Sequence, residues 1–255
     1  MQHFKQEDIQ KIKSELDMVG KRYFNLSSQL LKLSRNLKQE KAKEYLFHGV
    51  MRRLRVIYRC INNIFTIFPI ERETLLNQDE IDDVMINLHA FFVNISGIMD
   101  NLAWVFVHEK QLANTLKQRQ IGLFKKETED NFSNEFRQYL DSAQVATWHN
   151  EYLKNYRDTL SHRIPLYVPP KTLNSTQRSQ LDLIEKKIND SFKSSDIDTI
   201  DRLHSEEDKV GDVCPFFMHS LSESKGEYVV LHVQIITDFK TIEEIVGKFY
   251  EMFVL

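Results

Sequence analysis

The stretch from Glu80 to Glu109 most constrains how this chain can fold. Its apolar residues recur at alternating spacings of three and four, which places them along one side of a helix. They are Ile81, Met85, Leu88, Phe92, Ile95, Met99, Leu102 and Phe106. Such a seam is typical of a helix packed in a bundle. Polar residues interrupt the stretch and make it too polar for a membrane span, so we expect a buried helix.

The same spacing predicts further helices. It covers residues 44–68, where Pro69 ends the pattern, and it recurs over about 143–161 and 175–192. Residues 6–38 are also amphipathic, although a charged middle leaves open whether they form one helix or two. With only seven glycines and five prolines, the chain has few helix breakers. Residues 38–44 and the acidic stretch 193–211 are expected to be polar connections.

The last part of the chain has a different composition. Residues 213–221 and 227–237 are rich in aromatic and β-branched residues and predict two strands, joined in a hairpin by a turn at 222–226. A helix over 240–253 would cover them. The predicted fold is mainly α: an antiparallel helical bundle with a C-terminal β-hairpin plus helix. We expect an N-terminal helical extension (1–39), the bundle (40–195), and the acidic linker with the hairpin and helix (196–255).

Composition and motifs exclude several classes of function. The net charge is −3 and the pI is about 6.3, so any contact with nucleic acid needs a local basic patch. Cys60 and Cys214 lie far apart, and the N-terminus lacks a signal peptide, which favours a cytoplasmic protein with reduced thiols and no membrane anchor. The chain has no Gly-rich phosphate loop, HExxH, GxSxG or Cys/His cluster, so we expect no metal and no cofactor.

The stretch NYRDTLSHRIPLYVPP, residues 155–170, holds the candidate catalytic residues Arg157, Asp158 and His162. An imidazole exchanges protons near neutral pH, and a guanidinium grips phosphate oxygens at two points. These groups suit attack of a ribose 2′-hydroxyl on the adjacent phosphate. Asp158 precedes His162 by one helical turn and would orient the ring. The alternative is ordinary helix termination, since a histidine near a helix C-terminus also favours the helix dipole.

The spacing of the pair suggests that two copies of the chain act together. Five residues along a helix separate Arg157 and His162 by roughly 140° and about 7.5 Å, which is awkward for one copy. If the helix packs against its twin across a two-fold axis, two arginines and two histidines meet in one cleft. We therefore expect a homodimer.

The segment YRDTLSHRIP resembles the motif of the HEPN superfamily, in which an arginine, four to six residues and a histidine follow one another, often with a polar residue after the arginine. Arg157, Asp158 and His162 match these three positions, and the upstream helices and proline-rich exit are similar to a bacterial HEPN subgroup. The resemblance covers about residues 40–195. It implies a dimeric helical bundle and a metal-independent endoribonuclease, in the setting of a toxin or phage-defence effector with a protein antitoxin or regulator. Other HEPN proteins only bind RNA.

Two further patterns lie on the long helices. Arg52, Arg55 and Arg59 form a basic stripe that would bind RNA phosphates, or else a solvated face paired with nearby acids. Asn87, Asn94, Asn101 and His108 recur every seven residues beside the apolar seam. Among the residues near this edge, Asp100 and Asn101 are the expected supports of Arg157, unless local hydrogen bonding explains them.

The sequence therefore favours cleavage of RNA, with His162 taking the 2′-hydroxyl proton and Arg157 stabilising the phosphate. Two alternatives stay open. One is a non-catalytic RNA-binding or assembly module that uses the same residues. The other is a regulatory helical protein that recruits another protein through its C-terminal hairpin by strand addition.

Overall fold

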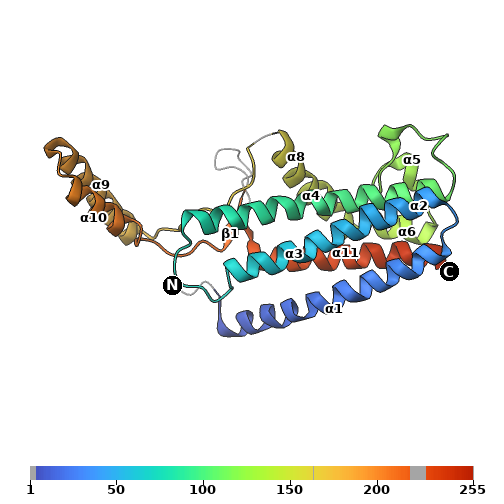
Figure 1. The fold of residues 1–255 in the computed structure, drawn as a ribbon, viewed down its shortest axis with the longest axis horizontal. Helices are drawn as coiled ribbons and strands as arrows, with labels where there is room; N and C mark the ends of the chain where they lie inside the picture. Colours follow the sequence, from blue (N-terminus) through green and yellow to red (C-terminus); the bar gives the residue numbers. More distant parts are fainter. Residues whose placement is uncertain (1–3, 163, 219–227, 255) are drawn as a thin grey trace.

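The computed structural model describes residues 4–162, 164–218 and 228–254, with the backbone only at 161, 162 and 254. Four long helices lie side by side: α1 (Gln6–Asn36), α3 (Arg52–Ile67), α4 (Gln78–Glu109) and α11 (Leu231–Val254). Figure 1 shows α3 running opposite to the other three. The predicted mainly helical bundle, with a small C-terminal sheet followed by a helix, is confirmed.

The second long helix is built from three segments. α2 (Glu40–Glu44), the π-helical segment η1 (Tyr45–Met51) and α3 follow one another without a break, and α3 ends just before Pro69. The expected connection at 38–44 was wrong from Glu40 onward. The chain turns in only three residues, 37–39, where the Glu109 carboxylate accepts the backbone N–H of Lys38 and of Gln39 at 2.9 and 3.0 Å.

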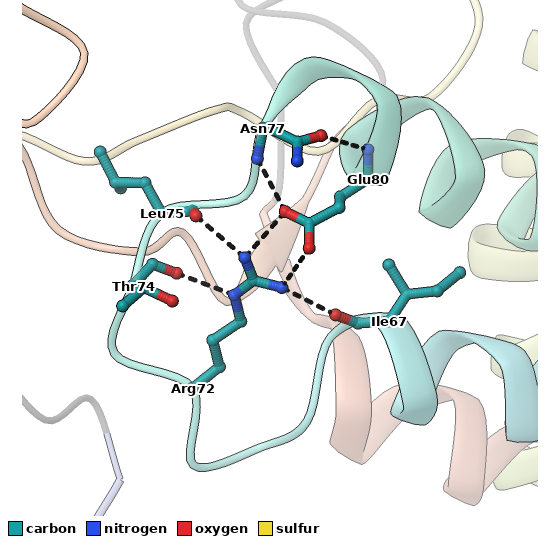
Figure 2. Close-up of polar contacts among 6 residues, drawn as sticks. All are labelled: Ile67, Arg72, Thr74, Leu75, Asn77 and Glu80. Atoms are coloured by element: carbon teal, nitrogen blue, oxygen red, sulfur yellow. Dashed lines mark hydrogen bonds and ion pairs between the residues drawn. The ribbon is translucent and has the colours of Figure 1, made fainter. Parts of the chain in front are cut away.

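A dense set of hydrogen bonds holds the connection between α3 and α4 (Figure 2). Asn77 and Glu80 form a capping box at the start of α4, each side chain accepting the other's backbone N–H. Arg72 binds both oxygens of Glu80, at 2.8 and 2.7 Å. It also donates to the carbonyls of Ile67, Thr74 and Leu75. The ends of two antiparallel helices are therefore tied together.

α4 is the core helix of the bundle. Its predicted apolar seam is buried, apart from Met85, which is partly exposed. Among the described residues, α4 is the one helix long and apolar enough to cross a membrane by length and composition. More than half of that apolar window is covered by the rest of the protein, which is consistent with a soluble protein.

The middle of the chain covers one end and one side of α4 with short elements. η2 (Gln118–Gln120), α5 (Lys126–Glu129) and α6 (Asn134–Leu140) come first. The helix expected at 143–161 is present as α7 (Ala143–Thr147), the π-helical segment η3 (Trp148–Leu153) and α8 (Lys154–His162). α8 packs on α4 on a different side from α3 (Figure 1).

Residues 175–207 form a helical hairpin with a small core of its own. α9 (Ser175–Ser194) ends at Ser195, whose left-handed backbone turns the chain into α10 (Ile197–Glu207). The polar connection expected at 193–211 was therefore wrong over Ile197–Glu207, where Leu203 of α10 is buried against α9, on Leu181, Ile184 and Ile188. Residues 208–211 do lie outside the helices. Figure 1 shows this hairpin projecting from the end of the bundle.

The C-terminal sheet is smaller than the sequence suggested. β1 (Phe216–Phe217) pairs antiparallel with β2 (Val229–Val230), and the expected turn at 222–226 lies outside the described residues. α11 begins at Leu231, so residues 231–237 are helical and not a strand. The reason is burial at helical spacing, through Leu231, Ile235, Ile236, Phe239 and Ile242. α1 and α11 share the main core with α3 and α4, and the expected domain boundaries stay predictions.

Candidate functional site

Buried contacts on one face of η3 and α8 fix the position of Arg157. Trp148 Nε1 and Tyr152 OH donate to the two carboxylate oxygens of Asp238 on α11, at 2.9 and 2.8 Å. Tyr156 is buried and stacks on Phe92 of α4, with ring centroids 5.1 Å apart. Because Tyr156 points into the core, its neighbour Arg157 is directed outward, and its side chain is 45% exposed.

Arg157 lines a cleft of about 160 Å³ between α8, α4 and the segment before α5, here named the α8 cleft. Its lining includes three cationic side chains, Lys125, Lys154 and Arg157, and one carboxylate, Asp100. Desolvation raises the pKa of Asp100, while the positive charges of Arg157, Arg53 and Lys125 oppose the rise. The structure thus brings together Asp100 and Arg157, the pair that the sequence suggested.

The other two candidate catalytic residues are placed less fully. Asp158 lies beside Arg157, with 3.5 Å between its carboxylate and the guanidinium Nε. His162 is in the last turn of α8, and its side chain lies outside what the structure describes. The backbone therefore carries all three residues on one short helix at the edge of the α8 cleft.

Sequence reasoning missed a second histidine near Arg157. His149, in the π-helical segment η3, lines the α8 cleft and stacks on Phe124 with ring centroids 3.8 Å apart. Burial lowers its pKa, as do the nearby cations, so its neutral, proton-accepting form is favoured. A π-helical turn often marks a functional site. No residue pattern in this sequence predicted the π-helical turn that holds His149.

A second depression, here named the α3 groove, lies along η1, α3 and α4 and has a volume of about 390 Å³. Arg53 is central to it. The Arg53 Nε donates to Asn101 Oδ1 at 2.9 Å, and its Nη1 donates to Asn94 Oδ1 at 3.2 Å. Asn101 therefore supports Arg53 rather than Arg157, for which the sequence had proposed it.

Two glycines make this arrangement of Arg53 sterically feasible. A Cβ on Gly97 would lie 2.3 Å from the Arg53 Cζ, and a Cβ on Gly49 would lie 2.7 Å from the Asn101 side chain. The guanidinium thus lies flat against the backbone of α4. Asn94, Gly97 and Asn101 share one face of α4, and the small residue between the two amides was the available signal in the sequence.

The basic stripe on α3 is exposed and only partly in the groove. Arg52 lines the α3 groove, whereas Arg55 and Arg59 do not. Within the described part of the chain, none of the three forms an ion pair with an acidic side chain. Their charges are therefore available to an external anion. Asn87, on the same edge of α4, accepts a hydrogen bond from Asn63 and is accounted for by packing.

The α8 cleft and the α3 groove lie on two sides of α4 and share their electrostatics. Arg53 from one and Arg157 from the other both act on the Asp100 carboxylate. Both arginines therefore lie close enough to this carboxylate to favour its charged form. Among the residues that the structure describes, no three His, Cys, Asp or Glu side chains gather to hold a metal.

Comparisons with known proteins add no family to this picture, since no family model, no curated protein and no solved structure matches the chain.

Proposed function

We propose that this protein is a metal-independent endoribonuclease of the HEPN type, cytoplasmic and dimeric, that cleaves RNA at the α8 cleft. One observation carries the proposal. Arg157 is exposed, is on the same helix as His162, and lines a cleft whose described charged side chains are three cations and one carboxylate. Such a lining attracts a phosphodiester, which carries one negative charge per nucleotide.

In the proposed reaction, the 2′-hydroxyl oxygen attacks the adjacent phosphorus while His162 accepts the hydroxyl proton. Arg157 stabilises the charge that develops on the non-bridging oxygens. The bond from phosphorus to the 5′-oxygen breaks, and that oxygen takes up a proton from solvent water, while the protonated His162 returns its proton to solvent. The products are a 2′,3′-cyclic phosphate and a 5′-hydroxyl, so atoms and charge balance without a metal. Asp158 orients its neighbours and does not react.

The dimer completes this proposal. With α8 packed against its twin, the arginine and histidine of one copy complement those of the other. Lys154, Asn155 and Arg157 are exposed, so this face of α8 is not covered by any segment that the structure describes. Light scattering on the purified protein measures the mass, and a monomer at assay concentration would contradict the composite cleft.

The test is cleavage of a mixed-sequence single-stranded RNA in EDTA, with analysis of the new ends. We expect cyclic-phosphate ends from the wild type and from Arg202→Ala, which removes an exposed charge on α10. Arg157→Ala and His162→Ala should each lose activity by at least about a hundredfold, the scale of a lost acid-base or electrostatic group.

His149→Ala separates the two histidines. If His149→Ala loses cleavage and His162→Ala keeps it, His149 and not His162 is the proton acceptor. If the wild type binds RNA and leaves it intact, the non-catalytic RNA-binding alternative is correct, and the unpaired arginines of α3 favour that alternative over a protein with no RNA partner.

A further inference from the structure

The α3 groove has the features of a built anion site. Arg53 is held by two amide oxygens, from Asn94 and Asn101, and no carboxylate in the described part of the chain forms an ion pair with it. Amide acceptors orient a guanidinium without neutralising it, so its full charge remains available. Its Nη2 makes no hydrogen bond to a described residue and is not among the buried polar atoms that lack a partner, so it faces solvent.

The other charges of the groove agree with this polarity. Arg52 lies on the rim, exposed and unpaired among the described residues. His48 is also exposed on the rim. The one carboxylate in the lining, Glu44, is bound to Lys41 at 2.7 Å, so its charge is offset. Among its described lining residues, the groove therefore has two guanidinium groups without a carboxylate partner, and its carboxylate, Glu44, is paired.

An aromatic stack stands at one end of the groove. Tyr45, which lines the groove, stacks on Trp104 with centroids 5.4 Å apart, and Trp104 in turn stacks on His108 at 5.4 Å. A positive groove beside aromatic rings is the combination that binds single-stranded nucleic acid, because phosphates pair with the cations and unstacked bases pack on the rings. A duplex keeps its bases inside and cannot use the rings.

We propose that the α3 groove is a phosphate-binding site for a single-stranded RNA that crosses α4 on its way to Arg157. Arg53 and Arg52 bind one backbone phosphate of the strand, and a base of the same strand packs at the ring stack of Tyr45. The identity of the ligand as RNA rests on the proposed function. The two arginines act in binding and not in the cleavage step.

Binding of a 2′-O-methyl RNA tests this site without cleavage, since the methyl group removes the nucleophile. Arg53→Ala should weaken binding by about tenfold to a hundredfold, as expected when a charged hydrogen-bonding group is lost. The plot of log K against log salt should also become less steep, by the amount that one phosphate contact contributes. Arg202→Ala removes the same charge from α10 and should leave the affinity unchanged.

Gly97→Ala provides a second variant that keeps every charge. Its methyl group would overlap the Arg53 guanidinium and displace it from between the two amides. We expect Gly97→Ala to weaken RNA binding about as much as Arg53→Ala does. Tyr45→Ser should weaken the binding of single-stranded RNA and leave the weaker binding of a duplex unchanged. Circular dichroism of each variant checks that the helices are intact.

The outcomes distinguish this site from the nuclease. If Arg53→Ala and Gly97→Ala bind the RNA as the wild type does, the α3 groove is not its site. Equal binding of duplex and single strand, or competition by inorganic phosphate alone at the affinity of the RNA, would also overturn the proposal. If the wild type does not cleave RNA but Arg53→Ala still weakens binding, the groove is supported and only the nuclease is refuted.

Discussion

Two buried titratable groups on α11 make opposite contributions to the pH dependence of stability. Asp238 is fully buried and accepts hydrogen bonds from Trp148, Tyr152 and Gln234, yet desolvation raises its pKa from 3.8 to about 6. His232 is 1% exposed, and its Nε2 donates to the Phe68 carbonyl at 2.6 Å. Burial lowers the pKa of His232 from 6.5 to about 4.

The direction of each effect follows from proton linkage. Folded Asp238 holds its proton more tightly than the unfolded chain does, so its contribution is complete below pH 3.8 and is lost as pH rises through about 6. Folded His232 holds its proton less tightly, so its contribution is complete above pH 6.5 and is lost as pH falls through about 4. At about 1.4 kcal/mol per pKa unit, each amounts to about 3 kcal/mol. In the wild type they nearly cancel between these limits.

Asp238→Asn removes one of the two groups and keeps the side-chain shape. We expect its free energy of unfolding to fall by about 3 kcal/mol more than that of the wild type as pH is lowered from 6.5 to 4, because His232 is then unopposed. Urea titrations followed by circular dichroism, repeated across this pH range, give the two curves. Asp201→Asn, at an exposed position on α10, is the control and should follow the wild type. Parallel curves for Asp238→Asn and the wild type would refute the reasoning.

Two further substitutions test the connection between α3 and α4 and the α9–α10 hairpin. Arg72→Ala removes the five hydrogen bonds that Arg72 donates in the connection between α3 and α4. The carbonyls of Ile67, Thr74 and Leu75 lose this donor and Glu80 keeps only the Asn77 N–H, so we expect a loss of about 3 kcal/mol in urea unfolding. Arg137→Ala, at a partly exposed arginine on α6, should change stability by less than about 0.5 kcal/mol. Equal losses in the two variants would contradict a stabilising role of Arg72 in the connection. Leu203→Ala should destabilise the α9–α10 hairpin by about 2 to 5 kcal/mol. Amide hydrogen exchange should then rise in that hairpin alone, and a matching rise in α4 would show that the hairpin is not an independent unit.

Local patterns in the sequence were sufficient for the main helices. The spacing of three and four from Ile81 to Phe106 predicted α4, because the period of burial on a helix is set by its own geometry. The same pattern predicted α1, α3 and α9, and Pro69 marked the end of α3. It failed at residues 231–237, where β-branched residues fit a strand as well as a buried helix, and burial against the bundle selected the helix.

For the candidate site, the sequence determined the chemistry available and the tertiary structure determined the partners. Arg157, Asp158 and Asp100 were named from residue type and spacing, and the packing of α8 on α4 placed two of them, Arg157 and Asp100, in one cleft. The hold of Asn101 on Arg53 and the place of His149 in the same cleft emerged only from the fold. Such pairs join residues on separate helices, so their geometry depends on how the helices pack. The spacing of residues within one helix does not determine that packing.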